Sequence, residues 1–241
     1  MYLLAPAEYP ISVKRLVALL VIYLLAAGCR QGISDKSSAF TLKEGDLLFQ
    51  DLDCGPLCDA IEKVTTGYNG AKFTHVGIVA KDGNDNFVVI EAVSSGVQTT
   101  PLQDFLNKSF DAKNQPKVAV GRLKPAFSCL IASAIKNALA LRGKPYDKGF
   151  AINNDAYYCS ELVYEAFLRA NDNKPVFTLR PMTFKDPNTD VIFPPWQEYF
   201  SRLNTPVPEG RPGINPGGIS RSPVLDIIHL YGKPDGWKKS F

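Results

Sequence analysis

The alternation of hydrophobic and polar positions predicts a domain of mixed helices and strands that begins near Phe40. Apolar runs bounded by turn residues predict β-strands within residues 45–53, 73–102 and 117–124. In the middle segment, two β-rich runs flank the turn-forming letters DGNDN, so we expect a hairpin there. A last strand or helix end is expected in residues 222–232.

Apolar residues at helical spacing predict a short helix in residues 54–65 and a longer one in residues 127–141. A second long helix is expected to begin at Cys159 and to run to about Ala170. Residues 101–109 could form one further helical turn.

Residues 171–222 are rich in proline and include the segments FPPWQEYF and PEGRPGINPGG. Their aromatic content is too high for a free linker. We therefore expect an irregular arm that packs on the domain and borders the substrate cleft.

The first 28 residues have the pattern of a signal peptide. Lys14 and Arg15 precede the apolar run LVALLVIYLLAAG, which small residues and Cys29 follow. The run is too short to favour a retained membrane-spanning helix, which needs about 20 apolar residues. The letters LAAGC resemble a bacterial lipobox, which predicts an exported lipoprotein with Cys29 as its lipidated residue. Plain secretion and an uncleaved anchor are the alternatives.

Composition agrees with one globular domain in residues 41–241, preceded by a polar tether in residues 29–40. The chain is 45% hydrophobic and 21% charged. Removal of residues 1–28 takes away two basic residues and one acidic residue, which lowers the formal net charge from +3 to +2. A charge so close to neutral does not suggest a nucleic-acid partner.

Four cysteines lie beyond the signal peptide. In an exported protein Cys54 and Cys58 could form a disulfide. Cys129 lies within an apolar helical pattern and is expected in the core. No metal is expected, because the Cys54 and Cys58 pair has no second pair and the chain has only two histidines.

The stretch AYYCSELVYEAF places Cys159 at the start of an amphipathic helix. The N-terminus of a helix and a nearby imidazolium both stabilise a thiolate. The position therefore suits a nucleophile, although a buried cysteine that only packs in the core is the alternative.

Of the two histidines, His75 in FTHVGIVA is the better candidate base, and His229 is the other. If the hairpin is symmetric about Asn84, Gly77 lies opposite Glu91, and Glu91 lies diagonal to His75 on one face of the sheet. Glu91 is then placed to orient the imidazole, with Gly77 leaving room. A histidine that is merely buried is the alternative reading for both.

Residues just before the nucleophile are candidate substrate contacts. The segment RGKPYDKGFAINNDAYYC should form one wall of the cleft, with Tyr146 and Asp147 as possible contacts. Tyr158 is a candidate contact or side-chain donor to the carbonyl oxygen, beside the backbone N–H of Cys159. Ordinary packing for Tyr158 and turn formation for the segment explain these residues equally well.

The motifs GDLLFQ, FTHVGIV, VIEA and YYCSELVYEAF, in this order, resemble the circularly permuted branch of the NlpC-type papain-like cysteine hydrolases, in particular the YiiX/YebB-like group. In the ordinary branch the cysteine precedes the histidine, whereas here His75 precedes Cys159. The resemblance implies a papain-like α+β fold, with Cys159 as nucleophile, His75 as base and Glu91 as the third member.

The implied reaction is hydrolysis of an amide bond through a thioester, without a cofactor. Expected substrates are a peptide, a peptidoglycan stem fragment or an acylated amine. The enzyme is expected to be anchored to a membrane of a bacterial envelope. A lipid acyltransferase that forms the same thioester is the alternative enzyme. An inactive binding module is the alternative of another class.

Overall fold

The computed structural model describes residues 40–238. The predictions for the signal peptide, for most of the tether and for Cys29 therefore lie outside the described residues. Within the described range, none of the helices is long and apolar enough to cross a membrane. The domain described below starts at Thr41.

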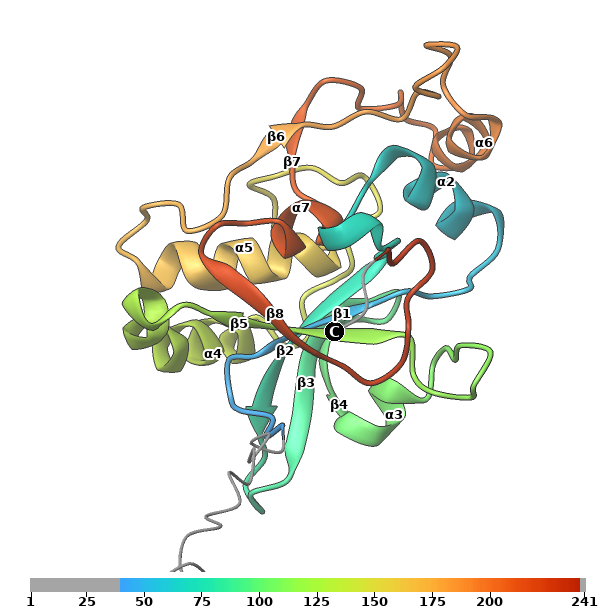
Figure 1. The fold of residues 1–241 in the computed structure, drawn as a ribbon. Helices are drawn as coiled ribbons and strands as arrows, with labels where there is room; N and C mark the ends of the chain where they lie inside the picture. The colour runs from blue at the N-terminus through green and yellow to red at the C-terminus, as the bar shows by residue number, and fades with distance from the viewer. Residues whose placement is uncertain (1–39, 239–241) are drawn as a thin grey trace, which may run out of the picture. The chain divides into compact units, whose positions relative to one another are not determined.

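A six-stranded antiparallel sheet forms the centre of the domain, in the order β4-β3-β2-β1-β5-β8 (Figure 1). The strands are β1 Leu47–Gln50, β2 His75–Lys81, β3 Phe87–Val93, β4 Gly96–Pro101, β5 Val118–Leu123 and β8 Leu225–Leu230. The strands expected near residues 45–53 and 117–124 are confirmed, and the last segment is a strand.

The register of the hairpin agrees with the sequence-based prediction. Ile78 pairs with Ile90 and Ala80 pairs with Val88, which is the symmetry about Asn84 expected from the turn. The prediction missed β4, which follows β3 after a two-residue turn and pairs with it along its whole length. Two strands were therefore expected where the chain forms three.

The helices are close to their predicted positions. They are α2 Pro56–Val64, the single turn α3 Leu102–Leu106, α4 Ile131–Ala140 and α5 Cys159–Ala170. The helix expected over residues 127–141 is shorter, because Pro125–Leu130 forms a 3₁₀ segment before α4. Cys129 lies in this segment and is exposed, so its predicted place in the core is wrong.

Helix α5 is fixed to the sheet by its apolar stripe. Leu162, Val163, Ala166 and Phe167 are all completely buried. The helix packs against α4 and against strands β2 and β3. Burial of several large side chains along one face holds the helix, and with it its N-terminus, in a defined position over the sheet.

The proline-rich segment packs on the domain as expected, but it is less irregular than expected. It contains α6 Pro194–Arg202, α7 Pro216–Ser220 and a small ribbon of β6 Arg180–Pro181 paired with β7 Pro212–Gly213. Aromatic side chains of the arm, including Phe184, Trp196 and Phe200, form a cluster with Ala60 of α2. Figure 1 shows α6 beside α2.

Candidate active site

Cys159 is the first residue of α5 and is 93% buried, with 7% of its surface exposed. The preceding residue, Tyr158, has an extended backbone and donates its N–H to the Glu161 carboxyl group at 3.4 Å. The first N–H groups of a helix have no acceptor within the helix. Cys159 is thus placed where backbone donors and the helix dipole favour negative charge.

His75 and Glu91 come from neighbouring strands and meet on one face of the sheet. The Nε2 atom of His75 lies 2.6 Å from Oε2 of Glu91. Both side chains are buried, Glu91 completely. This contact confirms the diagonal arrangement predicted from the hairpin register.

The Cys159 side chain lies close enough to the same imidazole to raise its pKa. Since Glu91 occupies Nε2, the nitrogen left for the thiol is Nδ1. The three candidate residues therefore form a chain, with the imidazole of His75 between the thiol and the carboxylate. This is the arrangement of an activated nucleophile with an oriented base.

Two further residues hold the Glu91 carboxylate. Thr100 on β4 donates its hydroxyl to Oε1 at 2.6 Å, and the ammonium of Lys108 lies 2.7 Å from Oε1 and 2.9 Å from Oε2. Neither residue is predicted from the sequence pattern, because Thr100 lies on the unexpected strand β4 and Lys108 follows α3. Recognition of a third strand after the SSG turn would have placed Thr100 beside Glu91.

The charged forms of His75 and Glu91 stabilise each other. Burial lowers the pKa of His75, but hydrogen bonds and charge from Cys159 and Glu91 outweigh it and raise the pKa to about 9. Burial raises the pKa of Glu91, but the contacts with His75, Lys108 and Thr100 lower it to about 2. At neutral pH the imidazole of His75 is therefore charged, with Cys159 on one side and the Glu91 carboxylate on the other.

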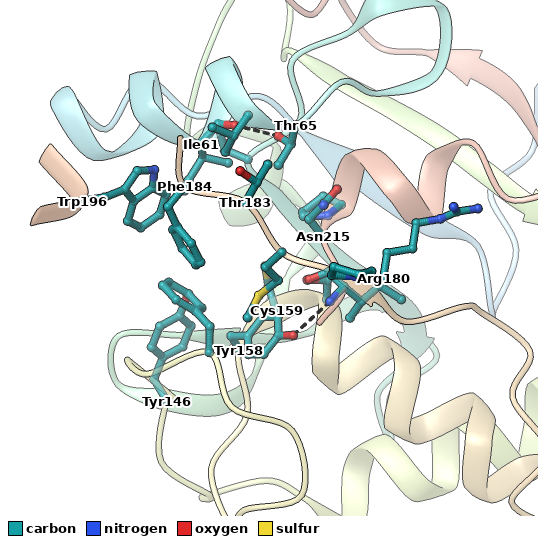
Figure 2. Close-up of a pocket in the computed structure, with 18 residues that line it drawn as sticks. Ile61, Thr65, Tyr146, Tyr158, Cys159, Arg180, Thr183, Phe184, Trp196 and Asn215 are labelled. Carbon is teal, nitrogen blue, oxygen red and sulfur yellow. Dashed lines mark hydrogen bonds between the residues drawn. The ribbon is translucent and has the colours of Figure 1, made fainter. Parts of the chain in front are cut away.

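Cys159 opens into a cavity of about 180 Å³. Its walls come from α2, from the loop before α5 and from the arm, and most of its lining is apolar: Ile61, Val64, Tyr146, Phe150, Tyr158, Pro181, Met182, Phe184, Trp196, Ile214 and Pro216. Figure 2 shows Phe184 and Trp196 on one side of Cys159 and Arg180 on the other. The arm therefore borders the site, as predicted.

The three predicted substrate contacts have different positions. Tyr146 and Tyr158 line the cavity, and the Tyr158 hydroxyl accepts a hydrogen bond from the N–H of Ile214 at 3.2 Å. Asp147 does not line the cavity. Its carboxylate instead accepts hydrogen bonds from the backbone of Gly149 and Ala151. The turn-forming role, which was the alternative for this segment, fits Asp147 better than a contact with substrate.

The other histidine lies away from this site. His229 is on β8, opposite Val120 of β5, and two strands separate β8 from β2. It does not line the cavity. His75 is thus the histidine that the fold brings to Cys159.

Cys54 and Cys58 form a disulfide at the start of α2. Among the described residues, the carboxylates of Asp51, Asp53 and Asp235 are close enough together to suggest a metal site. The ammonium of Lys117 already lies among them, at 2.6 Å from Asp53 and 3.4 Å from each of the other two. A cation of the protein itself thus lies among these carboxylates, and none of the three aspartates lines the cavity.

Comparison with known proteins agrees with this geometry. A model of the family described as permuted papain-like amidase enzymes, YaeF/YiiX, matches residues 41–229. A solved structure titled metalloprotein yiiX from Escherichia coli O157:H7 is similar, with a TM-score of 0.65 and 22% identity. The likeness covers 80% of this chain and 99% of that one, and concerns the fold. Comparison with the curated proteins finds no match.

Proposed function

The chain belongs to the permuted papain-like amidase family, and from this premise we propose that it hydrolyses an amide bond next to an apolar group through a thioester on Cys159. The observation that carries the proposal is the chain of contacts from Glu91 through His75 to Cys159 at the edge of an apolar cavity.

In the first half of the reaction, Sγ of Cys159, whose proton the imidazole of His75 holds, attacks the carbonyl carbon of the amide. The C–N bond breaks as the imidazolium of His75 gives its proton to the leaving amine, and a thioester is formed. Negative charge on the carbonyl oxygen is met by the backbone N–H of Cys159, with the Tyr146 or Tyr158 hydroxyl as a second donor.

In the second half, a water molecule attacks the thioester and His75 accepts its proton. The C–S bond breaks, the carboxylic acid leaves, and the starting state is restored with the proton of Cys159 on His75. Glu91 holds the ring of His75 in position and stabilises its charged form throughout.

The lining of the cavity supports a choice among the expected substrates. Apolar walls suit the hydrocarbon part of an acylated amine or an apolar side chain of a peptide. A peptidoglycan stem fragment is more polar and fits less well. Transfer of the acyl group to an acceptor other than water is the second candidate, because an acceptor with an apolar part would bind between the same apolar walls.

The place of action that we propose is a bacterial envelope, with a lipid anchor on Cys29. It is supported by the signal-peptide pattern of residues 1–28 and agrees with the disulfide between Cys54 and Cys58, since disulfides persist in oxidising compartments. Incorporation of labelled palmitate by the wild-type chain, and its loss in Cys29→Ser, tests the anchor.

The first test of the chemistry is the pH dependence of alkylation of the full chain carrying Cys29→Ser, with peptide mapping of the label. We expect rapid labelling of Cys159 well below pH 8, because the helix N-terminus and the imidazolium of His75 both favour the reactive form of the sulfur. His75→Ala should slow this labelling, and Cys159→Ala should abolish it. The exposed Cys129 is a reference thiol in the same molecule.

Labelling of Cys159 no faster than that of Cys129 at any pH, and unaffected by His75→Ala, would exclude the activated pair and favour a binding module. With an active thiol, incubation with an acylated amine separates the two enzyme reactions. Release of the free acid indicates hydrolysis, whereas acylation of an added amine in preference to water indicates transfer.

A further inference from the structure

A second cavity, of about 330 Å³, lies next to the one that holds Cys159. The two cavities share five lining residues: Arg180, Pro181, Met182, Ile214 and Asn215. The ribbon strand β6 thus contributes to the walls of both. The two cavities are therefore adjacent.

The second cavity differs from the first in its charge. Arg180 and Arg221 both line it, and no aspartate or glutamate does. Within residues 40–238 the arginine ion pairs are formed by Arg122, Arg169 and Arg202, and neither Arg180 nor Arg221 takes part in one. Among the described residues, neither guanidinium group thus has a carboxylate partner, although Nε of Arg221 donates to the carbonyl oxygen of Gly217 at 3.4 Å.

The direction of Arg180 fits a role in this second cavity. Arg180 lines the cavity at Cys159, and its guanidinium group points away from Cys159 (Figure 2). Asn215 uses its Oδ1 to accept the N–H of Gly218 at 2.7 Å, which leaves its amide nitrogen as a donor. Arginine groups and neutral donors on one wall suit an oxyanion, because a guanidinium can donate two parallel hydrogen bonds to it.

We propose that the second cavity is a subsite for an anionic group, a carboxylate or a phosphate, on the same substrate whose apolar part occupies the cavity at Cys159. The substrate class is then an amide with an apolar group on one side of the scissile bond and an anion on the other. This inference rests on the proposed function for its reacting bond, but the binding it describes does not require turnover.

The test measures binding by calorimetry to the full chain carrying Cys29→Ser and Cys159→Ala, so that no ligand is consumed. Matched ligands are N-phenylacetylglycine and its methylamide, succinic acid monobenzylamide and its methylamide, and N-phenylacetylethanolamine with and without a phosphate. The two amide series place the anion on opposite sides of the amide bond, and the third replaces carboxylate by phosphate.

In at least one series, the anionic ligand should bind about tenfold more tightly than its neutral partner, as expected for charge-assisted hydrogen bonds. Arg180→Gln and Arg221→Gln should each reduce this preference, and the double variant should abolish it. Arg221→Lys should retain part of it. Arg211→Gln removes a positive charge from the same arm without touching either cavity, and should leave the preference unchanged.

Equal binding of anionic and neutral ligands in all three series would overturn the subsite, and so would a preference that survives in the double variant. A preference confined to the phosphate or to the carboxylate series would support the subsite and identify its ligand. The alkylation experiment fails or succeeds separately, since it reports on Cys159 and His75 and not on the arginines.

Discussion

The ammonium of Lys108 lies within 2.9 Å of both carboxylate oxygens of Glu91, the residue that hydrogen bonds to His75. Lys108 is partly exposed, whereas Glu91 is buried. A positive charge from outside the predicted catalytic chain therefore neutralises part of the charge that stabilises the imidazolium. Lys108 is a positioning residue in this arrangement, because it acts on His75 through Glu91.

Replacement of Lys108 by Met should shift the pH profile of activity. Without the ammonium, the Glu91 charge acts more fully on His75, so the pKa of His75 should rise above its value of about 9. Activity that needs the imidazolium is lost as pH rises through the pKa of His75. The decline of activity on the alkaline side of the pH profile should therefore move to higher pH, by as much as about one pH unit. Lys108→Arg keeps the charge and should leave this decline in place. A shift to lower pH in Lys108→Met would contradict this account.

Gly77→Ala should damage the hairpin and the site together. A Cβ atom at Gly77 would lie 2.4 Å from Cγ1 of Val89 and 3.4 Å from Cβ of Glu91. Such overpacking costs about 1–3 kcal/mol of unfolding free energy and would displace Glu91 from His75. Urea unfolding and kcat/KM measure the two effects. In the same hairpin, a Cβ atom at Gly83 would have no other atom within 4 Å. Gly83→Ala should therefore change neither the unfolding free energy nor kcat/KM.

Glu161→Gln should stabilise the protein at neutral and alkaline pH. Burial raises the pKa of Glu161 to about 9, above the ordinary value of 4.5, so the folded state keeps a proton that the unfolded state loses. Stability therefore falls as pH rises between these two values, by up to about 1.4 kcal/mol per pH unit. The glutamine removes this loss.

The difference in unfolding free energy between Glu161→Gln and the wild type should be near zero at pH 4 and should grow up to pH 8. Urea unfolding at each pH measures it. Glu198→Gln is the control, because Glu198 is exposed and its own pair with Arg202 lies at the surface. A difference independent of pH would show that Glu161 is ionised in the folded state.

Loss of the disulfide should loosen one wall of the cavity. Cys54 and Cys58 are joined just at the start of α2, and α2 contributes Ile61 and Val64 to the lining. Closing so short a loop is worth about 2 kcal/mol in the chain-entropy model. The double variant Cys54→Ser/Cys58→Ser should lose about this amount in urea unfolding. Dithiothreitol should lower the stability of the wild type and leave the double variant unchanged.

Local patterns were sufficient to predict the centre of the candidate site. The turn DGNDN and the alternation on either side of it set the hairpin register, and that register places Glu91 diagonal to His75. The apolar stripe of α5 likewise places Cys159 at a helix start. Such features depend on residues close in sequence, so the sequence contains enough information to derive them.

Tertiary structure alone decided which distant residues complete the site. Lys108 reaches Glu91 only because the chain turns through β4 and α3 before returning to the sheet. Arg180 and Arg221 border one cavity only because the arm folds back over α5. Contacts between segments far apart in sequence depend on how whole elements pack, and no periodicity along the chain records that packing.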